Sequence, residues 1–221
     1  IYRDRDSIIA KEENTLYFRF QNANFFKNNE YFGEVIPGYT LPGFDFTPLL
    51  IYHPTKNTKL EAGYQLKLLF GKDNDMDRAS FLRFHWQIRE WFAVILGTLY
   101  SHNSHNLPEP IMNPEFSFST IRDEGLQFLI NRKNWKADLW VSWDDFIWFG
   151  DAANEKVWGG LSGKLKFDIG TSRLEIPVYV TADHTGGQID ATDNPSTTEL
   201  NVGSGLRFKK SLSGFVKQIE I

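Results

Sequence analysis

Residues 82–89, LRFHWQIR, alternate between apolar and polar side chains without interruption. One parity holds Leu82, Phe84, Trp86 and Ile88, and the other holds Arg83, His85, Gln87 and Arg89. Successive side chains of a β-strand point to opposite faces, so this stretch predicts a strand with one apolar face and one cationic face.

The same two-residue period recurs in four other segments. They are residues 58–71, 135–143, 157–169 and 199–210, with weaker candidates at 16–26, 44–52, 91–100, 125–131, 174–182 and 215–221. In the strongest segments the period holds for about ten residues, whereas the mean globular strand has ~5 to 6 residues and a tilted membrane-crossing strand ~9 to 11. Strand length therefore favours strands that cross a membrane.

The connections between these strands alternate between short and long. Short ones fall at 53–58, near 90, at 132–134, at 170–173 and near 211, and long ones at 27–43, 71–79, 101–124, 149–156 and 183–198. Outer-membrane barrels have short periplasmic turns and longer outside loops. We therefore expect an all-β, antiparallel up-and-down transmembrane β-barrel of about 10 to 12 strands, complete or part of a larger barrel, in a bacterial outer membrane. Residues 1–221 form one domain, with 1–14 as an N-terminal extension.

The alternation assigns each side chain to lipid or to the barrel interior. The predicted lipid-facing residues are Leu66, Leu82, Phe84, Trp86, Leu139 and Phe167. The predicted interior residues are Glu61, Lys67, Arg83, His85, Gln87, Arg89, Lys136, Asp138, Lys164, Lys166, Asp168 and Arg207. Mixed charges in a narrow barrel favour an ion-pair network over a wide pore, because open aqueous pores generally need ~16 to 18 strands.

Composition narrows the classes of function. A formal net charge of −4 argues against nucleic-acid binding, and the absence of cysteine excludes thiol chemistry. Aromatic residues make up 15% of the chain and gather near the strand ends, which favours two interfacial girdles over a buried core.

Several segments together resemble a family. The stretches FRFQNANFFKNNEYF, GYTLPGFDFTPLLIYHP, LEAGYQLKLLFG, FLINRKNWKADLWVSW and TADHTGGQID are similar to poorly characterised outer-membrane β-barrel proteins of Bacteroidota, over roughly residues 15–210. The resemblance implies a fold and a location, and it brings no catalytic residue with it.

Candidate chemistry is sparse in the sequence. His102 and His105 have a spacing that a metal site could use, but polar loop decoration is the favoured interpretation, as it is for His184 in its glycine-rich loop. No G-x-S-x-G motif is present, and Asp144 and Asp145 would point to opposite faces of a strand. Pro48 and Pro177 fall inside candidate strands and are expected at a bulge or near a strand end.

The sequence thus predicts a non-enzymatic barrel with a structural, transport-related (porin-like) or complex-forming role and no cofactor or metal. Its expected partners are the lipid bilayer or detergent and another outer-membrane protein, the latter through loops 101–124 and 183–198. Two alternatives stay open: a soluble β-sandwich that binds glycans through exposed Trp and Tyr, and an outer-membrane barrel hydrolase.

Overall fold

A computed structural model of the 221-residue chain shows one large antiparallel β-sheet. It describes residues 13–30, 38–71, 76–100, 104–112, 122–187, 189, 195–212 and 218–220. The predicted N-terminal extension, residues 1–14, lies almost entirely outside the described residues and stays a prediction.

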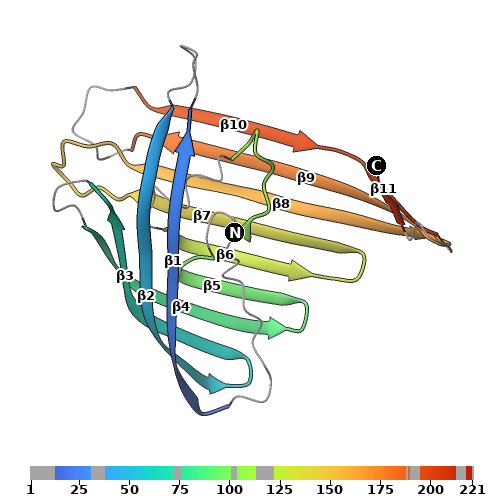
Figure 1. Cartoon of the computed structure of the whole chain (residues 1–221), viewed down its shortest axis with the longest axis horizontal. Helices are drawn as coiled ribbons and strands as arrows, with labels where there is room; N and C mark the ends of the chain where they lie inside the picture. The colour runs from blue at the N-terminus through green and yellow to red at the C-terminus, as the bar shows by residue number, and fades with distance from the viewer. Residues whose placement is uncertain are drawn as a thin grey trace.

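Twelve strands follow one another along the chain. They are β1 (Thr15–Asn29), β2 (Tyr39–Thr55), β3 (Thr58–Leu69), β4 (Met76–Arg89), β5 (Phe92–Thr98), β6 (Glu124–Asn131), β7 (Trp135–Asp145), β8 (Lys156–Ile169), β9 (Ser172–Thr185), β10 (Thr197–Ser204), β11 (Arg207–Ser211) and β12 (Gln218–Glu220). Each of β1 to β9 pairs antiparallel with the next strand, so the predicted up-and-down order and strand number are confirmed. Among the described residues β1 pairs with β2 alone, so these strands form an open sheet, and closure into a barrel stays a prediction. Figure 1 shows that the sheet is strongly twisted and curved, with β1 and β2 running steeply across the direction of β6 to β10.

Strands β10 and β11 are two parts of one path along the edge of β9. Thr197–Ser204 and Arg207–Ser211 both pair with β9 in a single continuous register. The ladder is interrupted opposite Pro177, which has no N–H to donate, and the Ser204 hydroxyl donates to the Pro177 carbonyl at 2.8 Å instead. Pro177 therefore lies in mid-strand with a break beside it, and the expectation of a bulge or strand end is wrong here.

Pro48 is accommodated in the same way in the middle of β2. It stays in register with Phe20 of β1, while the ladder to β3 is interrupted between Phe46 and Leu49. A Cβ on Gly63 of β3 would lie 2.1 Å from the Pro48 carbonyl oxygen, so only glycine allows this close approach.

The two faces of the sheet differ in exposure. Along β4, Leu82 is 64% exposed and Trp86 46%, whereas Arg83 and His85 are each 2% exposed. The polar face thus lies on the inner, concave side, and the apolar face lies outside. One curved sheet with an exposed apolar face is not a sandwich of two sheets, so the β-sandwich alternative is wrong.

The segment after β5 folds back against the inner face of the sheet. Leu99, Tyr100 and Met112 join Ala93 of β5 and Trp140 of β7 in a buried apolar cluster that also includes Ile95 and Trp158. Figure 1 shows this green segment extending from β5 toward β8 to β10. We call residues 99–112, where the structure describes them, the inner segment.

Part of loop 101–124, which the sequence predicts as a surface for a protein partner, belongs to the inner segment. Ser104 and His105 are buried, as is Met112, so part of this loop fills space within the curve of the sheet. Residues 101–103 and 113–121 of this loop, and residues 188 and 190–194 of loop 183–198, lie outside the described residues. A protein partner for these loops stays a prediction.

In the part of the chain that the structure describes, no helix is long and apolar enough to cross a membrane.

Candidate functional site

The inner face carries a buried ion-pair cluster built from β3 and β4. Glu61 lies 3.3 Å from the Lys59 Nζ and 3.2 Å from the Arg83 Nη1, and all three side chains are nearly inaccessible to solvent. Arg19 of β1 approaches Glu61 to 3.5 Å. Strand alternation places these groups on one face, and burial without a partner would be costly for each charge. Glu61 therefore holds together cations from three strands, β1, β3 and β4.

Tyr100 connects this cluster to the inner segment. Its hydroxyl lies 2.7 Å from the Nδ1 of His85 and accepts a hydrogen bond from Lys59 at 3.4 Å. The Arg83 guanidinium packs over its ring at 4.1 Å, and Arg83 also donates to the carbonyls of Thr98 and Leu99. These contacts fix the start of the inner segment against β4.

The centre of the inner segment holds a histidine paired with a carboxylate. His105 Nδ1 lies 3.2 Å from Asp138 Oδ2, and the other oxygen of Asp138 accepts from Gln127 Nε2 at 2.8 Å. Gln127 in turn accepts from the Tyr100 N–H at 3.1 Å. A carboxylate on Nδ1 orients an imidazole and favours the tautomer in which Nε2 is the basic atom, as in a hydrolase. We call His105 and Asp138 the His–Asp pair.

Aromatic rings enclose the His–Asp pair. The His105 ring stacks on Trp140 with centroids 3.8 Å apart and meets Trp158 edge to face at 5.5 Å. His105 is 0% exposed, and its Nε2 has no hydrogen-bond partner among the described residues. The Nε2 atom lies 4.0 Å from a carboxylate oxygen of Asp123. The Nε2 atom of His105 thus lies beside the aromatic rings of Trp140 and Trp158, which could also pack against an acyl chain.

Two serines of the inner face, one on β7 and one on β8, have hydroxyls whose hydrogen bonds go to groups other than the imidazole. The Ser162 hydroxyl donates to the backbone carbonyl of His105. Ser142 accepts from the Glu124 N–H at 3.1 Å and donates to Asp144. Within the described residues, the arrangement fits activation of water by His105 better than a serine nucleophile.

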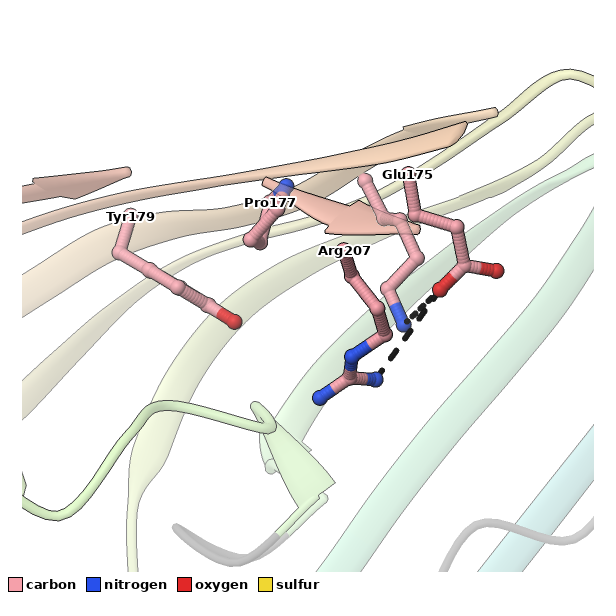
Figure 2. A pocket seen from close by; sticks show the side chains of 5 residues that line it. Glu175, Pro177, Tyr179 and Arg207 are labelled. Atoms are coloured by element: carbon pink, nitrogen blue, oxygen red, sulfur yellow. Dashed lines mark ion pairs between the residues drawn. The ribbon is translucent and has the colours of Figure 1, made fainter. Parts of the chain in front are cut away.

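A second feature of the inner face lies nearer the short-turn end. Lys164 of β8 and Arg207 of β11 approach the same oxygen of Glu175, at 3.4 and 4.0 Å (Figure 2). Together with Pro177 and Tyr179 they line a pocket of about 190 Å³, part of it open to solvent. We call this the cationic pocket.

The predicted interior residues divide by exposure. Glu61, Lys67, Arg83, His85 and Asp138 are buried, and Gln87, Lys164 and Lys166 are half-buried. The exposed residues of this set lie at strand ends or on the edge strand, and they are Arg89, Lys136, Asp168 and Arg207. Asp168 pairs locally with Arg173 at 2.6 Å, which is a surface contact rather than part of the buried network.

The predicted lipid-facing residues all lie on the opposite face. Leu82, Trp86, Leu139 and Phe167 are exposed, while Leu66 and Phe84 are half-buried among neighbouring outer side chains. Contact of this face with lipid stays a prediction, which the proposals below use.

Metal binding by the SHNSH stretch is not supported where it can be judged. His102 lies outside the described residues, and the Nδ1 atom of His105 is hydrogen-bonded to Asp138. The described residues contain no group of three or more His, Asp or Glu side chains arranged to hold a metal ion. His184 bonds to Thr198 at 2.8 Å, on the neighbouring strand.

The sequence does not reveal the His–Asp pair because its members are 33 residues apart on different elements. Alternation places Asp138 on the polar face of its strand, where it is buried, but His105 belongs to a segment without such a period. The only available signal is the position of a histidine in a long loop beside a strand with an inward carboxylate. That signal does not predict that the loop folds inward.

Comparison with known proteins gives the class of activity. Residues 8–221 match the family described as Lipid A 3'-O-deacylase-type. No curated protein and no solved structure matches the chain. The match agrees with the resemblance to outer-membrane proteins of Bacteroidota and is more specific.

The match also corrects the predicted function. The family is named for an enzymatic activity, so the prediction of a non-enzymatic, porin-like or structural barrel is wrong. The sequence-based argument failed because it looked for a serine elbow and paired carboxylates, and neither is the arrangement seen on the inner face. The chain, matched over nearly its whole length, belongs to the lipid A 3'-O-deacylase-type family.

Proposed function

We propose that this protein is an outer-membrane hydrolase that removes an ester-linked acyl chain from the 3' position of lipid A. The family match over residues 8–221 supports the reaction class. The observation that carries the proposal to named residues is the His–Asp pair, in which an imidazole and a carboxylate lie 3.2 Å apart within an aromatic wall.

The location follows from the fold and the proposed substrate. The outer face is apolar and exposed across the sheet, for example at Leu82, Leu139 and Phe167. Surrounding hydrocarbon would cover this face, while the buried charges remain inside. A lipid A deacylase needs its substrate in the same membrane, so an outer-membrane location suits both surfaces.

The proposed chemistry uses the pair as a general base. His105 Nε2 takes a proton from water as the water oxygen attacks the ester carbonyl, and Asp138 stabilises the imidazolium through Nδ1. The tetrahedral intermediate then breaks its bond to the sugar oxygen, which receives the proton back from His105. The products are a free fatty acid and a sugar hydroxyl.

Substrate access requires the aromatic wall to open, because His105 is fully buried. Trp140 and Trp158 are the side chains in contact with its ring. An acyl chain that displaces one of them would replace one apolar contact by another, at a small free-energy cost.

The reaction is tested by expressing the full chain in a Gram-negative host and measuring the mass of its lipid A. We expect a product lighter by one acyl chain, with fragmentation placing the loss at the 3' oxygen. The H105Q variant should leave lipid A intact while reaching the membrane in normal amounts. H184Q is the matched control, because His184 lies on β9 away from the pair and bonds only to Thr198 among the described contacts.

Two outcomes would contradict the proposal. Unchanged lipid A in cells that contain well-folded wild-type protein would show that the protein does not have this activity. Full activity in H105Q would show that the protein catalyses the reaction without the His–Asp pair.

A further inference from the structure

We infer that the cationic pocket, together with Lys136 and Lys166 beside its lining residues, binds a phosphate-class oxyanion. The inference stands on the charges and geometry of the short-turn end of the inner face and does not use the proposed deacylation.

Cations outnumber carboxylates on this part of the inner face. Five inward positions carry positive charge, and they are Lys136, Lys164, Lys166, Arg207 and Lys209. The carboxylates facing them are Glu175, shared by Lys164 and Arg207, and Glu220, which pairs with Arg207 at 3.1 Å and Lys209 at 3.2 Å. Asp168 is already matched by Arg173 at 2.6 Å. Within the described residues, these five cations thus face two carboxylates, which is an excess of three positive charges.

The register brings the excess cations together rather than apart. Lys136 of β7 lies directly opposite Lys164 of β8. Lys166, two residues further along the same face, lies opposite Glu175 of β9, which Lys164 and Arg207 already share. Directly opposed like charges destabilise an antiparallel pair. Within the described residues, neither Lys136 nor Lys166 has a carboxylate at ion-pair distance. Such an arrangement costs folding free energy unless an anion occupies the site.

The pocket offers that anion a shaped place. Figure 2 shows the Arg207 guanidinium beside the Glu175 carboxylate, with Pro177 and Tyr179 nearby. Lys164, from the neighbouring strand β8, approaches the same carboxylate at 3.4 Å. A guanidinium plane next to ammonium groups suits the several oxygens of phosphate better than a halide ion.

Position links the pocket to the rest of the inner face. Lys164 follows Ser162, whose hydroxyl bonds to the His105 carbonyl, by two residues on β8. One such step along a strand is about 7 Å. A free phosphate and the phosphate of a lipid headgroup offer the same oxygens, so the experiment has one arm for each source.

The test is thermal unfolding of the full chain in neutral detergent at constant ionic strength. Inorganic phosphate should raise the Tm of the wild-type protein in a saturable manner, and chloride or acetate should not. In the second arm, mixed micelles containing phosphatidic acid replace inorganic phosphate. Saturable stabilisation in either arm supports the site and assigns its source.

The K136Q/K166Q variant separates binding from a structural role. Neither lysine forms an ion pair in the described structure, so without phosphate this variant should unfold at the same or a higher Tm than wild type. Its affinity for phosphate should fall about tenfold to a hundredfold, the range expected when charged hydrogen bonds are lost. K56Q, in the exposed turn between β2 and β3, is the control and should bind as wild type does.

The inference is overturned if neither arm stabilises the wild-type protein beyond chloride and acetate. It is also overturned if K136Q/K166Q and K56Q respond to phosphate equally, because the effect would then be general screening. Activity is not a readout here, so the result is independent of whether the protein is a deacylase.

Discussion

The two faces of the sheet are built from the same strands and serve opposite surroundings. On β4 the outer residues Leu82 and Trp86 are exposed, while Arg83 and His85 one position away are buried. In a water-soluble protein these exposures would be reversed, because burying charge is costly and burying apolar surface is favourable. The contrast teaches that this fold buries its charged side chains in pairs on the inner face and leaves apolar side chains exposed on the outer face.

The largest expected effect comes from the inner face, at Glu61. Substitution by alanine would leave Lys59, Arg83 and Arg19 without their shared carboxylate in a buried site. We expect E61A to lower the free energy of unfolding by about 3 to 5 kcal/mol. Urea unfolding in detergent or lipid vesicles measures the change.

The control for this variant is E199A, on the exposed edge strand β10. Its effect should be within the ordinary range for surface substitutions, about 0.5 kcal/mol. Similar losses in E61A and E199A would mean that the buried cluster is not what distinguishes the inner face.

The outer face gives the next largest effect, and only in a membrane. Leu82 lies near the middle of β4, so L82R in lipid vesicles should cost about 2 to 4 kcal/mol. Leu16, at the start of β1, is the matched position near a strand end, where the same substitution should cost about 0 to 1 kcal/mol.

Unfolding titrations of both variants in vesicles compare the two depths. Equal and small effects at Leu82 and Leu16 would indicate that water, not hydrocarbon, meets the apolar face.

The smallest effect is expected for a charge pair at the rim. Lys156 and Asp145 lie 2.8 Å apart, but both side chains are more than half exposed. We expect K156Q to change the free energy of unfolding by about 0 to 1 kcal/mol, and less at high salt. A loss as large as that of E61A would contradict the distinction between rim and interior pairs.

Alternation in the sequence correctly predicts most of the sheet. The period-two pattern of 82–89 or 135–143 is a local property, since each side chain alternates with its neighbour whatever the rest of the chain does. Strand order also follows from local information, because short turns force antiparallel neighbours. The positions of Pro48 and Pro177 are not predicted correctly. The sheet accommodates a residue without a backbone N–H in mid-strand by interrupting the hydrogen bonds to one neighbouring strand.

The candidate site is less predictable because it depends on contacts between distant segments. Asp138 lies on a periodic strand, and alternation places it inside. His105 lies in a segment without period, and its burial depends on Trp140, Trp158 and Asp138 forming a surface that receives it. The spacing of residues in the sequence does not predict that this surface forms. The cationic pocket is intermediate, since alternation places Lys164 and Arg207 inside but only the register brings both to Glu175.

The central claim is that the His–Asp pair hydrolyses an acyl ester of lipid A. The most direct measurement is the rate of fatty-acid release from purified lipid A by detergent-solubilised wild-type, H105Q and H184Q proteins of equal thermal stability. The account predicts that H105Q is slower by about 10² to 10⁴, the contribution of a positioned general base, and that H184Q keeps the wild-type rate. Equal rates in H105Q and wild type would contradict it.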